Sequence, residues 1–180
     1  MATPTTLPAS FTAGQVLTAA QMNDLRGAFR VLQTVTTTKT DTFTTTSTSF
    51  TDVTGLSVSI TPQATSSTIL CIVTANVSCD PALTTVMGQL VRGSTAIAIG
   101  DAASNRIRAS FNTAPGAQSN IVGNTISFID SPATTSATTY KLQICSKGAT
   151  TAAVNRSTND PDNTGAARVV STITVMEISA

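Results

Sequence analysis

The clearest pattern in the chain is the alternation of apolar and polar residues between Thr138 and Cys145. The apolar positions are Tyr140, Leu142 and Ile144, and threonine, lysine and glutamine stand between them. A period of two residues is typical of a β-strand with one buried face and one solvated face. This segment is therefore predicted to be a strand.

A second strand is predicted just before it, from Ile121 to Ile129, because this run is apolar and rich in β-branched residues. The sequence Asp130-Ser131-Pro132 ends it, since proline has no amide hydrogen to donate to a sheet. The pair therefore forms a strand, a polar connection and a returning strand.

The same pattern recurs along most of the chain and predicts about ten strands. Residues 66–78 are the most apolar run and are expected to be central. Residues 168–178 are also strongly β-forming, so this last strand is expected inside a sheet and not at its edge. The other predicted strand segments are the threonine-rich residues 31–49, the alternating residues 56–60, the hairpin 86–92 with 95–99, residues 106–111 and the short run 152–154. Strands do not alternate with helices, which argues against an α/β fold and favours an antiparallel β-sandwich of the jelly-roll type.

One short α-helix is predicted near the N-terminus, after an extended arm over residues 1–16. Thr18 and Gln21 have the spacing of a capping box, and Leu17 and Met22 that of a hydrophobic staple. Met22, Leu25, Phe29 and Leu32 follow at spacings of three, four and three residues, as in a heptad seam.

Two arrangements of that helix are compatible with the seam. It either packs on its own domain, or three copies pack around a symmetry axis with Leu17, Met22, Leu25, Phe29 and Leu32 at the interface. The seam is too short to be stable alone, so the β domain would have to set the oligomeric state. We therefore expect residues 1–32 to serve attachment or trimerisation, and residues 33–180 to form the β domain.

Composition limits the classes of partner. Only 11% of the residues are charged, against roughly 25% in typical domains, and the net charge of +1 argues against nucleic acid as a partner. Small uncharged surface residues suggest contact between copies, although secreted monomers also have threonine-rich surfaces. We expect no signal peptide, no membrane insertion and synthesis in the cytosol, because no suitable apolar segment is present.

Three cysteines are present. Cys71 and Cys79 lie eight residues apart on one predicted strand, which separates them by roughly 26 Å at ~3.3 Å per residue. A disulfide needs Cα atoms within ~7 Å, so these two cannot pair. Reduced, buried cysteines are the favoured interpretation, while Cys145 could meet one of them across a sheet or form an intermolecular bridge.

Catalytic and metal-binding motifs are sparse. The chain has no histidine, which excludes Ser-His-Asp and Cys-His catalysis and imidazole metal sites. Most aspartates, including Asp80, Asp101 and Asp130, stand in turn contexts and are assigned to turns. The sequence Asp160-Pro161-Asp162-Asn163 has calcium-binding atom types but not the regular ligand spacing, so an ordinary exposed loop is favoured. We therefore expect no enzyme activity, no cofactor and no metal.

Arg106 and Arg108 share one face of their predicted strand. For these two arginines a solvated face or a salt bridge between subunits is favoured over a phosphate site.

Several short motifs together resemble a known family. They are F-T-A-G-Q-V-L-T-A-A-Q-M-N at 11–23, the segment 39–62, D-S-P-A-T-T at 130–135, Y-K-L at 140–142 and I-T-V-M-E-I at 173–178. This pattern resembles fibre and appendage proteins of tailed bacteriophages. The resemblance implies a virion structural protein, a homotrimer and a C-terminal jelly-roll domain similar to C1q and TNF. It transfers no receptor-binding residue. The chain departs from typical fibres because it is short and has no shaft repeats, so an adaptor, a short appendage or a capsid knob fits its length.

The resulting expectation is a virion protein that attaches to other virion proteins by its N-terminus and projects its β domain. Two loops, 112–119 and 155–166, are expected to be exposed and to contact a host-surface glycan or protein. Their candidate contact residues are Asn112, Pro115, Gln118, Asn159, Asp160, Asp162 and Asn163. The alternatives are a trimeric capsid decoration or head-fibre protein, and a stand-alone carbohydrate- or protein-binding jelly-roll module. The absence of Trp and the single Tyr140 weigh against a lectin, because sugar sites commonly stack on aromatic rings.

Overall fold

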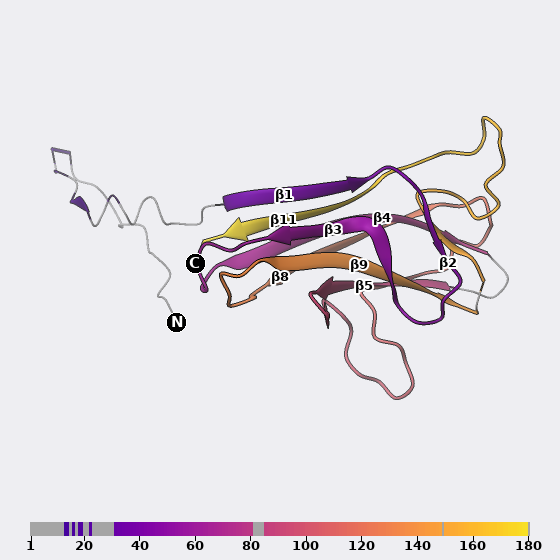
Figure 1. Cartoon of the computed structure of the whole chain (residues 1–180), viewed down its shortest axis with the longest axis horizontal. Coiled ribbons are helices and arrows are strands. Elements are labelled where there is room, and N and C mark those ends of the chain that lie inside the picture. Colours follow the sequence, from indigo (N-terminus) through magenta and orange to yellow (C-terminus); the bar gives the residue numbers. More distant parts are fainter. Residues whose placement is uncertain are drawn as a thin grey trace.

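The chain folds into two packed antiparallel sheets (Figure 1). The computed structural model describes residues 13, 14, 16, 18, 19, 22, 31–80, 85–148 and 150–179. Strands within these residues are β1 Val31–Lys39, β2 Phe43–Thr45, β3 Thr51–Ile60, β4 Thr68–Cys79, β5 Thr85–Arg92, β6 Thr95–Ile97, β7 Phe111–Thr113, β8 Val122–Asp130, β9 Thr138–Lys147, β10 Ala152–Val154 and β11 Ser171–Ile178.

The first sheet, called the β4 sheet, has the order β1-β11-β4-β10-β2, with β8 on the other edge of β4. Strands β10 and β11 lie end to end along the same edge of β4, because β11 pairs with residues 68–74 of β4 and β10 with residues 77–79. Strands β1 and β2 are likewise successive, since β1 pairs with β11 and β2 with β10. The sheet therefore has four strand positions.

The second sheet, called the β9 sheet, has the order β3-β9-β5-β6, with β7 also paired to β5. Strands β6 and β7 share one edge of β5, at residues 90–92 and 86–88 respectively. The sheet again has four strand positions. Along the chain, successive positions change sheet at every step except from β5 to β6 and β7, which is the order of a jelly roll and confirms the predicted antiparallel β-sandwich.

The core lies between the sheets and follows directly from the alternation in the sequence. In β4 every second residue from Ile69 to Val77 is buried, and in β9 the buried series begins with Tyr140 and Leu142. The predicted central position of β4 is confirmed, because β8 flanks it on one edge and β10 and β11 on the other. The interior position of β11 between β1 and β4 is also confirmed.

Three sequence expectations need correction. The helix that was predicted to end near Leu32 does not reach it, since Leu32 belongs to β1. Residues 106–110 form part of the connection between β6 and β7, and only Phe111 of the predicted strand 106–111 is in a strand. The last strand begins at Ser171 instead of Arg168. Within the described residues, no helix is long and apolar enough to span a membrane.

The three cysteines are buried thiols. Cys71 and Cys79 both lie on β4, as the sequence predicts. Burial, with a smaller effect of Asp130, raises the pKa of Cys71 to about 12, and burial also raises that of Cys145. These thiols therefore act as small apolar side chains of the core.

Candidate functional site

The outer face of the β4 sheet bears no charged side chain, and we call it the uncharged face. Its residues are those that alternate with the buried positions of β1, β4, β8 and β11. They are Val31, Thr34, Thr36, Thr38, Thr68, Leu70, Ile72, Thr74, Asn76, Gly123, Thr125, Ser127, Ile129, Thr172, Thr174, Met176 and Ile178. The strand register places them in rows across the sheet, and in one row the hydroxyls of Thr36 and Thr174 are hydrogen-bonded at 3.0 Å.

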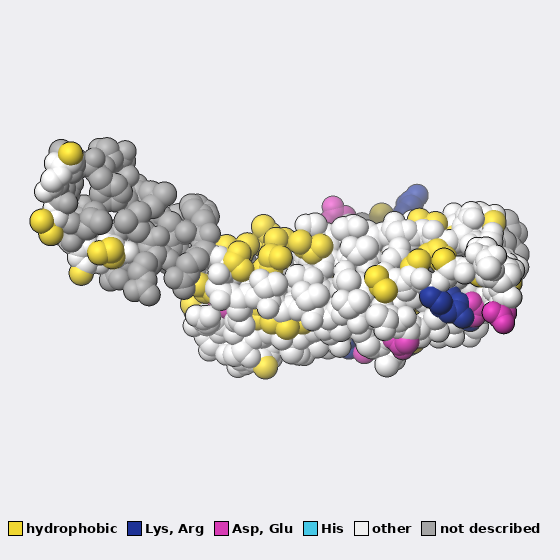
Figure 2. Space-filling view, turned by 90° about the horizontal axis from the view of Figure 1, so that it is seen from above, with side chains coloured by type: hydrophobic (Ala, Val, Ile, Leu, Met, Phe, Trp, Pro, Cys, Tyr) yellow, Lys and Arg dark blue, Asp and Glu magenta, His cyan; other side chains and the backbone are white. Residues whose placement is uncertain are grey.

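One end of the uncharged face is apolar. Ile129, Leu70 and Met176 are neighbours across β8, β4 and β11, and Ile178 pairs with Val31 at the start of β1. Ile129 and Val31 are 59% and 51% exposed. Figure 2 shows hydrophobic side chains gathered at the end of the sandwich where β1 begins, with most charged atoms toward the other half. Leu70, Met176 and Ile178 are partly buried, so apolar side chains that are exposed or partly exposed run across four strands, as is typical of contact surfaces.

The outer face of the β9 sheet is different, because it carries charged and polar side chains that are hydrogen-bonded to one another. Asp52 accepts hydrogen bonds from Lys141 at 2.7 Å and from Gln143 at 2.6 Å. Gln89 donates to Gln143 at 2.7 Å. The hydrogen bonds that Asp52 accepts lower its pKa, and the one from Lys141 has the largest effect. Charged groups that are paired with one another are suited to water, so of the two described sheets it is the β4 sheet that has an uncharged outer face.

The two loops predicted as contact loops meet at the end of the sandwich opposite the start of β1 (Figure 1). Both the backbone amide and the hydroxyl of Thr158 donate to the Gln118 carbonyl, at 3.1 and 3.2 Å. Gln118 in turn donates through its side chain to Asp80 at 3.1 Å. We call this end, formed by residues 115–121 and 155–170, the distal end.

Asn155 closes the base of the longer distal loop, between β10 and β11. It is fully buried and has a positive φ of 64°. Its side-chain amide donates to the carbonyls of Lys39 and Asp41 at 2.8 and 2.9 Å, and its oxygen accepts from Ser171 at 2.6 Å. Its backbone carbonyl accepts from the Val169 amide at 3.2 Å. Every polar group of this side chain is therefore engaged.

Two arginines hold the middle of the same loop. Arg156 pairs with Asp160 at 2.8 Å, and Arg168 pairs with both carboxylate oxygens of Asp160. The hydrogen bond from Arg168 is the main cause that lowers the pKa of Asp160. Because the carboxylate already faces two guanidinium groups, Asp160 fixes the loop conformation.

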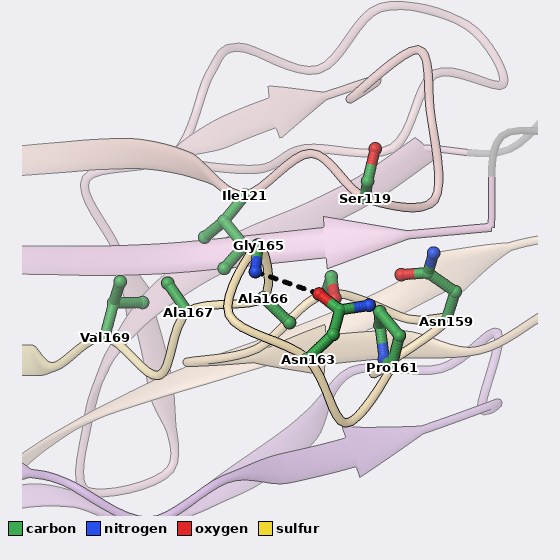
Figure 3. Close-up of a pocket in the computed structure, with 10 residues that line it drawn as sticks. Ser119, Ile121, Asn159, Pro161, Asn163, Gly165, Ala166, Ala167 and Val169 are labelled. Atoms are coloured by element: carbon green, nitrogen blue, oxygen red, sulfur yellow. Dashed lines mark hydrogen bonds between the residues drawn. The ribbon is translucent and has the colours of Figure 1, made fainter.

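A pocket of about 440 Å³ lies between the two distal loops (Figure 3). We call it the distal pocket. Its lining residues are Ser119, Ile121, Ser157, Asn159, Pro161, Asn163, Gly165, Ala166, Ala167 and Val169. Figure 3 shows Ile121, Ala167 and Val169 toward one end and Ser119 and Asn159 toward the other. No side chain that lines it is charged.

Asp130 has a role that its turn context in the sequence did not indicate. It is the last residue of β8 and is buried, with 7% exposure. It accepts a hydrogen bond from Tyr140 at 2.6 Å and pairs with Arg92 at 2.8 Å. Burial and this hydrogen bond raise the pKa of Tyr140. The cluster connects the β4 sheet to the β9 sheet.

Glu177, the only glutamate, is buried at the end of β11. It accepts hydrogen bonds from Gln33 at 2.6 Å and from the Gln63 amide at 2.7 Å. Burial alone would raise the pKa of Glu177, but these hydrogen bonds outweigh it and the pKa lies below its ordinary value of 4.5. The carboxylate therefore stabilises the fold at neutral pH.

Acidification is expected to remove the stabilisation that Glu177 provides. Because its pKa is lower in the folded state than in the unfolded state, this contribution is complete above the ordinary value of 4.5 and is lost as the pH falls through the folded pKa. We expect Glu177→Gln to lower the melting temperature at pH 7 and to flatten its decline between about pH 5 and pH 3. Thermal denaturation at several pH values measures this, and parallel pH profiles of the two proteins would contradict it.

The structure places most of the predicted contact residues at the distal end. Asn159 and Asn163 line the distal pocket, Asp160 forms the ion pairs, and Gln118 joins the two loops, while Asp162 is exposed nearby. Asn112 lies apart on β7, and Pro115 is buried, its carbonyl accepting from Asn120 at 2.7 Å.

Of the predicted helical interface, only two residues can be placed. Met22 is exposed, and its amide donates to the Thr18 carbonyl at 3.0 Å, but most of the predicted helix lies outside the described residues. Leu32 lies on β1 and is partly buried. Leu17, Leu25 and Phe29 lie outside the described residues, so the seam stays a prediction.

No protein-family model matches the sequence, and no curated protein matches it. Within the described ranges, no group of three or more cysteine, aspartate or glutamate side chains is placed to hold a metal ion. The described residues present two candidate surfaces for function, the uncharged face and the distal end.

Proposed function

We propose that this protein is a structural protein of a bacteriophage particle, a short homotrimeric fibre or appendage. The N-terminal segment attaches it to other virion proteins, and the jelly-roll domain projects from the particle. The motif at residues 11–23 and the later motifs support the phage assignment through their resemblance to fibre and appendage proteins. The observation that best supports self-association is the uncharged face of the β4 sheet.

Desolvation explains why copies would meet at this face. Burying a charged side chain in an interface is costly unless it is paired, whereas threonine methyl groups and the Leu70, Met176 and Ile129 side chains lose little on leaving water. The β9 sheet, with its Asp52 and Lys141 network, is better suited to remain outside. The trimeric state is proposed from the resemblance to phage fibre proteins, and the uncharged face is proposed as the interface between the three copies.

The positions of the two candidate surfaces are compatible with an appendage. The apolar end of the uncharged face lies where β1 begins at Val31, so the preceding chain enters beside it. The distal loops lie at the opposite end of the strands (Figure 1). In a trimer whose axis runs along the strands, attachment and exposed loops would occupy opposite ends.

A charge on the uncharged face is expected to separate the copies. We expect the wild-type chain to have a solution mass of roughly 55 kDa by light scattering, three times its 18.4 kDa. Ile129→Lys should shift it toward 18.4 kDa, because a buried unpaired ammonium group costs about 2 kcal/mol or more per contact. Ile107→Lys is the matched control, since Ile107 is 38% exposed but lies in the connection between β6 and β7.

Three results would contradict parts of the proposal. A wild-type monomer would reject self-association in solution, and a trimeric Ile129→Lys protein would remove the interface from the uncharged face. Electron microscopy of particles with a labelled chain tests the virion role directly. Label on the tail would support a fibre or appendage, label on the head would favour a capsid knob, and unlabelled particles would reject the virion role.

A further inference from the structure

We propose that the distal pocket binds a neutral saccharide unit. The inference rests on the proposed function, because it names the class of host-surface ligand that the distal end would contact. It concerns the pocket of about 440 Å³ between the two distal loops, at the end opposite the start of β1 (Figures 1 and 3). That volume lies within the range of roughly 300–1,000 Å³ that is typical of small-molecule sites.

The lining has the polar groups that sugar hydroxyls need. Ser119, Ser157, Asn159 and Asn163 contribute two hydroxyls and two carboxamides. The carboxamide oxygen of Asn163 accepts from the Gly165 amide at 2.9 Å, which leaves its amino group directed to other partners. Among the described residues, Asn159 has no hydrogen bond from its side chain and is exposed, so its donor and acceptor face solvent. A pocket with both hydrogen-bond donors and acceptors available suits a ligand that carries several hydroxyl groups.

The remaining lining is aliphatic. Ile121, Pro161 and Val169 provide the larger apolar surfaces, and Ala166 and Ala167 leave room between them. One face of a pyranose ring consists of C–H groups, which pack on such a surface without any loss of hydrogen bonds. Many sugars stack on an aromatic ring, but the lining of this pocket has none. The aliphatic surface would take the place of that ring.

The charges near the pocket favour a neutral ligand over an acidic one. Arg156 and Arg168 face Asp160, and Asp162 lies two residues further along the same loop. Two positive and two negative side chains leave no net charge to attract a carboxylate or a phosphate. Their side chains also lie outside the lining of the pocket.

The pocket is held in shape before any ligand arrives. Residues 155–170 would be a long loop for a compact domain, where connections above about 12–15 residues are usually functional or disordered. Here Asn155 fixes its base, Asp160 its middle, and Thr158 its contact with Gln118. Such preorganisation lowers the conformational entropy that ligand binding must otherwise remove.

Affinity at one site is expected to be weak, and several copies would raise it. Without an aromatic platform, a single sugar is expected to bind with a dissociation constant of about 1 mM or weaker. Three pockets on one appendage, facing a surface with repeated saccharides, would gain about 10²-fold or more in apparent affinity.

The test uses the full chain and free sugars. Glucose, galactose, N-acetylglucosamine and the acidic N-acetylneuraminic acid are titrated separately to tens of millimolar, with binding followed by saturation-transfer NMR. We expect at least one neutral sugar to bind, and Asn159→Ala to weaken it about five- to tenfold through the loss of one hydrogen-bonding group. Asn112→Ala, an exposed asparagine on β7, is the matched control and should leave binding unchanged.

A second variant, Ala166→Leu, fills the pocket and should abolish binding while the solution mass stays that of the wild type. Binding of N-acetylneuraminic acid alone, no binding of any neutral sugar, or equal binding by wild type, Asn159→Ala and Ala166→Leu would each overturn the inference. Particle labelling and the solution mass do not depend on the pocket. If the protein is a trimer and is found on the particle but binds none of the sugars, the saccharide site is refuted and the proposed function is still supported.

Discussion

Replacing Asn155 with alanine is expected to lower the free energy of unfolding by about 3–4 kcal/mol. The substitution removes three side-chain hydrogen bonds and leaves the carbonyls of Lys39 and Asp41 and the hydroxyl of Ser171 without this partner. Buried polar groups that lose their partners typically cost about 1–3 kcal/mol each before the structure relaxes. Alanine also tolerates the φ of 64° less well than asparagine.

Urea denaturation measures this difference, and Asn120→Ala is the matched control. Asn120 is exposed and donates one side-chain hydrogen bond, to the Pro115 carbonyl at 2.7 Å, so we expect a loss of about 1 kcal/mol or less. Asn155→Ala should also speed proteolysis within residues 156–168, because the base of the loop is no longer closed. Equal denaturation midpoints for the two variants would show that Asn155 does not hold β10 and β11 in place.

Replacing Asp130 with alanine is expected to have an effect of similar size, about 3–5 kcal/mol. The change leaves the Tyr140 hydroxyl buried without its acceptor and removes the ion-pair partner of Arg92. Both groups belong to the β9 sheet, whereas Asp130 belongs to β8. The loss therefore weakens the contact between the sheets and not only a turn.

Asp52→Ala is the control for Asp130→Ala, because Asp52 also pairs with a cation but is 53% exposed on the outer face of the β9 sheet. An exposed ion pair is worth about 1 kcal/mol or less. Thermal or chemical denaturation of both variants gives the comparison. If Asp130→Ala were no more destabilising than Asp52→Ala, the buried cluster would not contribute to the cohesion of the two sheets.

Much of the fold could be predicted because alternation in the sequence follows directly from burial. Residues 66–78, 86–92 and 138–145 have strong β-forming patterns, and β4, β5 and β9 cover them closely. The assignment failed where alternation occurs without burial. Residues 106–111 alternate, yet Arg106, Ile107 and Arg108 belong to an exposed connection, and the pairing with β5 begins only at Ser110 and Phe111.

The candidate site was only partly predictable. Turn-forming residues correctly indicated the two distal loops, but nothing local to Gln118 or Thr158 indicates that they meet, because forty residues separate them. Asp130 and Asn155 illustrate the same limit. Each stands in a sequence context typical of turns and is buried with partners that lie far away in the chain, since Arg92 is 38 residues from Asp130 and Lys39 is 116 residues from Asn155.

The end-to-end placement of β10 and β11 has a consequence for how such a protein can diversify. Both strands pair independently with β4, and the carbonyl of Asn155 and the amide of Val169 are joined at the base of the intervening loop. The segment between them can therefore be lengthened, shortened or exchanged without shifting the register of either strand. Residues 156–168 therefore form an exchangeable segment, through which a lineage or an engineer can change the surface of the distal end while the scaffold stays the same.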